Sequence, residues 1–172
     1  QVLPVSPTPV VLHARLADGT VVDGQSAVGR SSGIERVWST PTEITVSDDA
    51  VRAISEAELV VLGPGSLYTS LLPSLLMPEI LEALRTTHAL RVYVCNVSTQ
   101  AGETAGYDLA AHVEALLAHT GPGIVDLVLA NDLVDPSADD GLGGVPVRLR
   151  WPPMIADGVA TPALALETVV DP

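Results

Sequence analysis

The sequence contains no lysine, no phenylalanine and only one cysteine among its 172 residues. Because aromatic residues make up only 3% of the chain, a core must be built from Leu, Val, Ala and Ile, which the apolar content of 47% can supply. The single cysteine, Cys95, excludes an internal disulfide and makes a cytoplasmic location the simplest interpretation. No apolar run reaches the length that spans a membrane, and the first residues do not read as a signal peptide.

Positive charge is also scarce. Eight arginines stand against 21 acidic residues, which gives a formal net charge of −13. Nucleic acids and anionic bilayers would repel such a chain, so we expect neither nucleic-acid nor membrane partners. A small anionic ligand is still compatible with this charge, because a helix N-terminus or one arginine acts locally.

The most informative stretch runs from residue 59 to residue 70. Its first four residues, Leu59–Leu62, are apolar, as is typical of a strand buried on both faces, and a glycine-rich turn and a helix-compatible run follow. This order directs backbone N–H groups at an anion, so we expect a phosphate or carboxylate to bind there. The candidate ligand-binding residues are Gly63, Pro64, Gly65, Ser66, Thr69 and Ser70. No lysine follows the glycines, which excludes a Walker loop, and the alternative is a tight turn whose hydroxyls only cap the helix.

A second polar loop, residues 96–107, follows the next expected strand at residues 91–95. Twelve residues are long for a connection between a strand and a helix, although an ordinary connection remains the alternative. The candidate ligand-binding residues of this loop are Asn96, Thr99, Gln100, Glu103 and Thr104. We expect Cys95 to be a small core residue rather than a nucleophile, since no base lies near it in the sequence.

The order of predicted elements divides the chain into three parts. Residues 1–42 are expected to form an antiparallel β unit, with a hairpin at Asp18-Gly19, a looser turn at residues 29–33 and a strand after it. Residues 43–134 alternate between helices and strands, and residues 135–172 read as an irregular tail. The middle part predicts an α/β fold: a Rossmann-like parallel sheet with helices on both faces, whose neighbouring strands are 59–62, 91–95 and 126–130.

Local signals also place the helices of the middle part. Ser47 followed by two acidic residues indicates a helix start, and Pro73 and Pro78 split the next helical run into a pair. Asp108 is expected to cap a third helix.

The histidines do not suggest a metal site. His112 and His119 lie two turns apart on the third helix, a spacing that suits no common metal pair, so we expect surface or interface positions for both. His13 is expected on the exposed face of the hairpin.

Two long motifs resemble a known family. LGPGSLYTSLLP at residues 62–73 and CNVSTQAGET at residues 95–104 are similar to the bacterial gluconeogenesis factor (YvcK-like) family. That family is related to the phospholactate transferases (CofD-like) of deazaflavin cofactor synthesis. Flanking matches at residues 3–7, 18–20 and 36–38 extend the similarity over roughly residues 1–131.

The resemblance implies a cytosolic regulatory protein that binds a nucleotide sugar such as UDP-N-acetylglucosamine, or another nucleotide diphosphate. Members of the family support cell shape, cell-wall synthesis and growth on gluconeogenic carbon, with no firm reaction assigned and no cofactor implied. By analogy with the transferases, the first loop would contact the diphosphate and the second would line the other wall. The alternative is a transferase that moves a phosphate-linked group from a nucleotide donor, with Glu103 and Asp108 as the candidate bases within this chain.

The family opens with a strand and a glycine-rich turn that supply much of the nucleotide site, and this sequence shows no equivalent. We therefore expect the chain to correspond to the carboxyl-terminal part of the family's length and to form an incomplete domain. Such a domain would expose an apolar edge or face, which predicts a homo-oligomer or pairing with an amino-terminal half.

Overall fold

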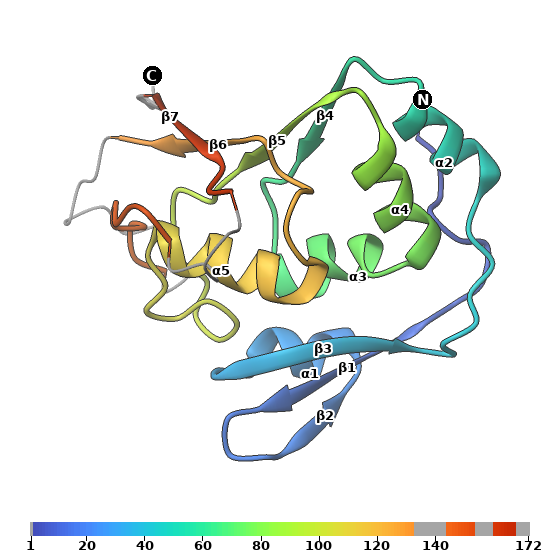
Figure 1. Cartoon of the computed structure of the whole chain (residues 1–172). Coiled ribbons are helices and arrows are strands. Elements are labelled where there is room, and N and C mark those ends of the chain that lie inside the picture. Colours follow the sequence, from blue (N-terminus) through green and yellow to red (C-terminus); the bar gives the residue numbers. More distant parts are fainter. Residues whose placement is uncertain (1, 133–143, 154–159, 168–172) are drawn as a thin grey trace.

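The computed structural model describes residues 2–132, 144–153 and 160–167. The described elements form three layers: a four-stranded parallel sheet, a layer of helices, and a three-stranded antiparallel sheet (Figure 1). Within these ranges no helix is both long enough and apolar enough to cross a bilayer.

The antiparallel sheet is built from β1 (Val11–Leu16), β2 (Val21–Asp23) and β3 (Ile34–Thr40), in the order β2-β1-β3. The predicted hairpin is confirmed, because β1 pairs antiparallel with β2 across Asp18-Gly19. The turn expected at residues 29–33 is wrong in part, since α1 (Gln25–Arg30) extends into it. A helix of six residues has too little periodicity to be predicted from the sequence. It forms because one of its own side chains, Val28, is fully buried in the core.

The parallel sheet contains β4 (Leu59–Leu62), β5 (Leu90–Val94), β6 (Leu127–Asn131) and β7 (Ala163–Glu167), in that order. The prediction that the first three are parallel neighbours is confirmed. β7 corrects the expectation of an irregular tail, since it pairs in parallel with β6. Its Ala-Leu-Ala-Leu-Glu sequence has a low β propensity, so pairing with the β6 edge rather than local preference makes it a strand.

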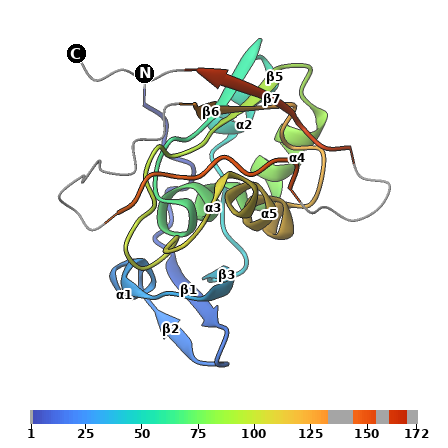
Figure 2. The same ribbon diagram turned by 90° about the vertical axis from the view of Figure 1, so that its left-hand side faces the viewer.

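After β3, the described helices are α2 (Asp48–Ser55), the π-helical turn η1 (Leu67–Leu71), α3 (Leu72–Leu75), α4 (Pro78–Thr86) and α5 (Leu109–Thr120). Helices α3, α4 and α5 lie between the two sheets (Figure 2), and α2 packs against α4 beside the β4 end of the parallel sheet. Pro78 starts α4 as the sequence predicts, and Asp108 caps α5 by accepting a hydrogen bond from the N–H of Ala111 at 2.8 Å. The core contains fully buried Tyr68, Leu72 and Leu116.

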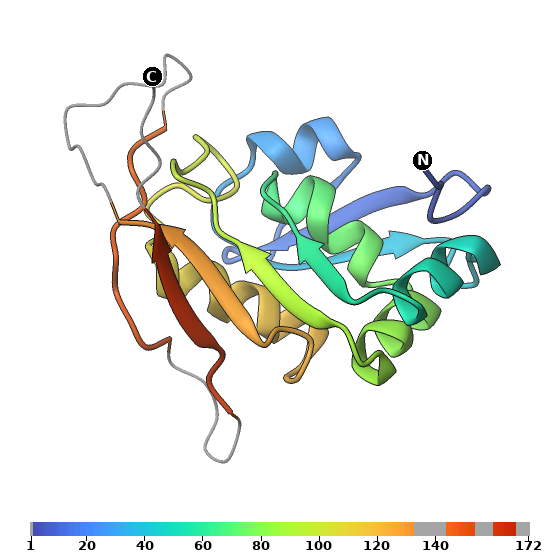
Figure 3. The ribbon, with the colours of Figure 1, turned by 90° about the horizontal axis from the view of Figure 1, so that it is seen from above.

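The two faces of the parallel sheet differ in what covers them. Helices α3, α4 and α5 cover the face toward the antiparallel sheet, whereas no helix of the described residues crosses the outer face (Figure 3). The expectation of helices on both faces is therefore met on one face only. On their other side these helices face the antiparallel sheet, which we predicted from the sequence as a separate unit.

The histidines are less exposed than expected, although His13 does lie on the face of β1 opposite the buried Leu12 and Ala14. His13 stacks on Trp38 with ring centroids 5.4 Å apart, and its ring nitrogens lie 2.6 Å from an Asp23 oxygen and 2.7 Å from the Thr40 hydroxyl. His112 is fully buried, and His119 accepts a hydrogen bond from the backbone N–H of Val37 at 3.1 Å. His112 is enclosed because α5 lies between the two sheets, whereas His119, near the end of that helix, stays half-buried.

The buried histidines make stability depend on pH. Burial lowers the pKa of His112 and His119 from the usual 6.5. The two histidines therefore take up protons at a higher pH in the unfolded chain than in the folded chain. The stability that the neutral side chains contribute is complete above pH 6.5, and it is lost as the pH falls through their pKa values in the folded protein. We expect the urea concentration at the unfolding midpoint to decrease when the pH is lowered from about 7.5 to about 5.5. His119→Gln should reduce this dependence, and a dependence equal to that of the parent protein would contradict the assignment to His119.

Candidate functional site

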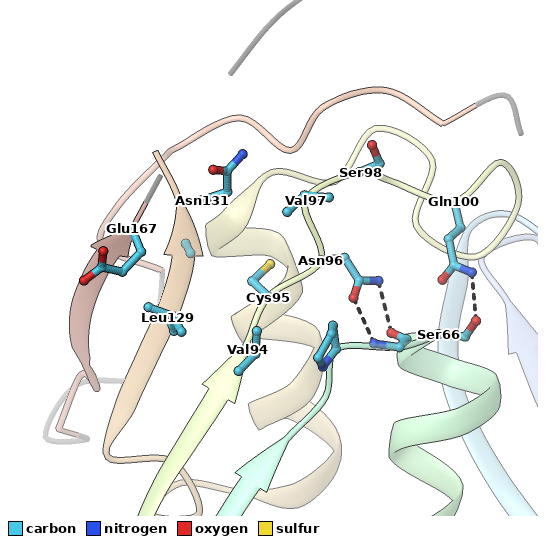
Figure 4. Close-up of a pocket in the computed structure, with 13 residues that line it drawn as sticks. Ser66, Val94, Cys95, Asn96, Val97, Ser98, Gln100, Leu129, Asn131 and Glu167 are labelled. Carbon is cyan, nitrogen blue, oxygen red and sulfur yellow. Dashed lines mark hydrogen bonds between the residues drawn. The ribbon is translucent and has the colours of Figure 1, made fainter. Parts of the chain in front are cut away.

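A cavity of about 580 Å³ lies at the carboxyl ends of the parallel strands (Figure 4). It is lined by the glycine turn after β4, the start of the loop after β5, the end of β6 and the last residue of β7. Open α/β sheets hold their ligands at this edge, because successive strands deliver their loops to one place. Five of the residues proposed from the sequence line it: Pro64, Gly65, Ser66, Asn96 and Gln100.

Side-chain amides join the two predicted loops. Asn96 accepts a hydrogen bond from the Gly65 N–H and donates one to the Gly65 carbonyl, both at 3.0 Å. Gln100 donates to the Ser66 hydroxyl at 2.8 Å (Figure 4). Its own Oε1 is buried and has no hydrogen-bond partner within the described part of the chain. The two loops are thus held as one polar wall, with an acceptor left for a donor group.

Gly63 permits the close approach of this turn to the sheet. Its φ of +84° is one that side-chain-bearing residues rarely adopt, and a Cβ there would lie 2.9 Å from the carbonyl oxygen of Val94. Gly65 differs, because a Cβ there meets nothing within 4 Å. Gly63 therefore has a structural role, while Gly65 faces open space at the cavity.

The helix start after the turn already has an acidic partner. The buried carboxylate of Glu103 accepts hydrogen bonds from the N–H groups of Tyr68 at 2.7 Å and Thr69 at 3.3 Å, and from the Thr69 hydroxyl at 2.8 Å. A negative charge at a helix N-terminus is stabilising, so this carboxylate occupies the place proposed for an external anion. Ser66, at the N-cap position, makes no side-chain capping bond, so the alternative in which its hydroxyl caps the helix is not what the structure shows.

The remaining proposed residues lie away from the cavity lining. Thr99 is buried and its hydroxyl accepts a hydrogen bond from the Val145 N–H at 3.0 Å. The Thr104 hydroxyl accepts one from the Gln100 N–H at 2.9 Å, and Ser70 is exposed on η1. Thr99 and Thr104 thus hold the second loop in shape.

Burial of Glu103 depends on close packing of its loop. A Cβ at Gly102 would lie 2.6 Å from the carbonyl oxygen of Gly29, so the loop contacts α1 backbone to backbone. Beside it, Tyr68 and Tyr107 share a hydrogen bond between their hydroxyls at 2.7 Å, and burial raises the pKa of Tyr68 well above its usual value. This network fixes the start of η1 and, with it, the end of the glycine turn.

Two titratable side chains near the site are unsuited to nucleophilic or base chemistry. Burial raises the pKa of the Cys95 thiol to about 12, so the thiol stays protonated, as expected for a core residue. Although burial opposes it, hydrogen bonds from Arg150 and the Ala111 N–H hold the pKa of Asp108 below its usual value. In the described parts of the chain, no three His, Cys, Asp or Glu side chains form a group that could hold a metal ion.

The sequence reasoning missed three polar residues that line the cavity: Ser98, Asn131 and Glu167. Asn131 ends β6, so the rule that found Asn96 after β5 would also have found it. Glu167 could not be found in this way, because β7 was not predicted. The apolar part of the lining includes Val94 and Leu129.

A comparison with protein families identifies the chain. A family described as "2-phospho-L-lactate transferase CofD" matches residues 1–140. The chain belongs to the CofD family. Among curated CofD-related proteins, the "Gluconeogenesis factor" of Halalkalibacterium halodurans is 40% identical over 172 residues, covering 99% of this chain and 52% of the relative. The "Gluconeogenesis factor" of Bacillus subtilis is 47% identical over 132 residues, covering 76% of this chain and 42% of the relative.

A solved structure supports the same assignment. The crystal structure of a UPF0052 family protein from Bacillus halodurans matches with a TM-score of 0.81 and 36% identity. The match covers 96% of this chain and 54% of that chain. These comparisons confirm the resemblance carried by residues 62–73 and 95–104. The chain spans about half the length of the curated CofD-related proteins it matches.

Proposed function

We propose that the cavity binds a nucleotide sugar of the UDP-N-acetylglucosamine type and that the chain belongs to a cytoplasmic regulator of cell shape, cell-wall synthesis and gluconeogenic growth. The observation that carries the proposal is the position of the cavity. It lies where a glycine turn and an amide-bearing loop meet at the carboxyl edge of a parallel sheet, in a relative of gluconeogenesis factors.

The polar groups of the cavity suit the two ends of such a ligand. The Ser66 hydroxyl hydrogen and the second N–H of each amide group, on Asn96 and Gln100, are not used by the hydrogen bonds between the loops, and such donors suit the oxygens of a diphosphate. Glu167 lies on another part of the lining, where its carboxylate can accept hydrogen bonds from ribose hydroxyls. The apolar surface of Val94 and Leu129 between them fits a flat ring.

Four of the other residues, Thr69, Thr99, Glu103 and Thr104, hold the two loops in shape from behind, and Ser70 is exposed outside the cavity lining. The Glu103 carboxylate takes the Tyr68 and Thr69 N–H groups, which leaves the residues before η1 to meet the diphosphate. The proposal therefore places the anion at Gly65 and Ser66.

A transferase is the second candidate, and the match to the phospholactate transferase family over residues 1–140 favours it. The described carboxylate on the cavity lining that could act as a base is Glu167, not Glu103 or Asp108. Calorimetric titration with UDP-N-acetylglucosamine, followed by assay of the released nucleotide, separates the candidates. Saturable binding without turnover supports the regulator, turnover supports the transferase, and the absence of binding contradicts both.

Ser66→Ala tests the diphosphate end of the cavity. Loss of a hydrogen bond to a charged group should cost about 1–2 kcal/mol, or roughly tenfold in affinity. The thermal midpoint should fall only slightly, since the Ser66 hydroxyl makes no capping bond and its loss costs the protein the hydrogen bond donated by Gln100. Ser70→Ala is the matched control, because this exposed serine lies one turn further along, outside the cavity lining. Equal affinities for both variants and the parent would contradict the placement of the ligand.

A further inference from the structure

A second pocket, of about 240 Å³, lies where the antiparallel sheet meets the helical layer, and we call it the junction pocket. One wall is formed by residues 36–39 at the edge of β3, and the opposite wall by the corner between α3, which packs on β3, and α4 (Figure 1). Pro73 and Pro78 create this corner, since neither fits the interior of a regular helix. The described lining of the junction pocket shares no residue with the cavity at the parallel sheet.

Part of the junction pocket is lined by apolar side chains. They come from the segment after β3 and from the corner of the two helices: Ile44, Pro73, Leu76, Met77 and Pro78. Met77 is buried, and Ile44 and Leu76 are half-buried against the core. Pockets for drug-sized ligands measure about 300–1,000 Å³, so this smaller pocket suits a single ring or a short branched chain.

Ser39 brings open hydrogen-bond donors to the opposite wall. β3 is an edge strand, and the N–H of Val37 already points out of the sheet, toward His119 at 3.1 Å. Because N–H groups two positions apart in a strand point the same way, the Ser39 N–H leaves the same edge. Leu12, which pairs with Ser39, is consistent with this, since its carbonyl accepts from the Gly24 N–H on its other side. The Ser39 hydroxyl is buried and has no hydrogen-bond partner among the described residues. An acceptor bound at Ser39 would therefore satisfy donors that the fold leaves open.

Arg36 adds a positive charge at the rim of the junction pocket. It is exposed and forms no ion pair with a described residue. Arg15, its partner across the sheet, does have a counter-ion, because Glu35 lies 3.7 Å away. Although the chain carries 21 acidic residues, none of the described residues that line the junction pocket is acidic. The polar wall therefore favours an anion, against the sign of the net charge.

We propose that the junction pocket binds a small carboxylic acid whose body is one ring or one branched aliphatic chain. The carboxylate accepts hydrogen bonds from Ser39 and faces the Arg36 guanidinium, and the body lies against the apolar wall at Leu76 and Met77. A carboxylate matches the single arginine of the described lining in charge, whereas a phosphate carries up to two charges. The proposal goes beyond the nucleotide-sugar cavity and does not depend on what that cavity binds.

Two acids and their matched alcohols test the proposal: phenylacetate with phenylethanol, and isovalerate with isoamyl alcohol. Each is titrated into the isotope-labelled 172-residue chain while the amide signals are followed by NMR. We expect at least one acid to shift the amide signals of Ser39, Ile44 and Met77 saturably, with a Kd on the order of 1 mM. Its alcohol, which has the same body without the charge, should bind about fivefold more weakly or not at all.

Arg36→Gln should weaken binding of that acid about fivefold, and added salt should weaken it in the parent. Arg30→Gln is the matched control, because Arg30 is also exposed but lies outside the lining of the junction pocket. Circular dichroism shows whether each variant is folded. The proposal is overturned if neither acid binds saturably, if acid and alcohol bind equally, or if folded Arg36→Gln keeps the parent affinity. Shifts centred on Asn96 and Gln100 overturn it too, because they would place the acid in the other cavity.

Discussion

Glu103→Ala is expected to lower the free energy of unfolding by about 3–5 kcal/mol. The substitution removes the acceptor of three hydrogen bonds, from the N–H of Tyr68, the N–H of Thr69 and the Thr69 hydroxyl. Glu103 is only 3% exposed, so these donors lose their partner in a place that water reaches poorly. Urea unfolding followed by circular dichroism measures the change.

Two further variants isolate the cause. Glu103→Gln keeps one acceptor oxygen and loses the charge at the helix start, so it should cost less, about 1–2 kcal/mol. Glu82→Ala, at an exposed position of α4, should stay within about 0.5 kcal/mol of the parent. A loss below about 1 kcal/mol in Glu103→Ala would show that the carboxylate does not hold the start of η1.

Gly65→Val is expected to weaken nucleotide-sugar binding by more than about a hundredfold, which corresponds to about 2.8 kcal/mol. A Cβ at Gly65 meets no protein atom within 4 Å, so the side chain extends into open space beside the proposed diphosphate. The protein should stay folded, with a stability loss limited to the backbone strain of a φ of +157°, about 1–3 kcal/mol. Calorimetric titration at a temperature where circular dichroism shows a folded protein measures the affinity.

Gly63→Ala is the control for this substitution. Its Cβ would lie 2.9 Å from the Val94 carbonyl oxygen, so the change should destabilise the end of β4 even in the absence of ligand. Gly65→Val therefore separates binding from stability, and Gly63→Ala does not. Undiminished affinity in folded Gly65→Val would mean that the stretch is only a tight turn.

The parts of the site that the sequence predicted are those that follow directly from strand order. Two apolar strands, β4 and β5, come shortly before Gly65, Ser66, Asn96 and Gln100, and parallel strands bring the residues after them to one edge of the sheet. Glu103 shows where this reasoning stops. Its residue type and its loop suggested a ligand contact, but only the fold brings its carboxylate to the N–H of Tyr68, 35 positions earlier in the chain.

The sequence by itself determined the antiparallel β unit, three parallel neighbours, the helix break at Pro78 and the glycine turn after β4. Local patterns predict these features: runs of apolar residues, the positions of prolines, and turn residues. Only the tertiary structure decided that α1 and β7 exist, that His112 is buried, and that the outer face of the parallel sheet is open. Each of these depends on contacts between residues far apart in the chain, which supply the burial and pairing that weak local preference does not.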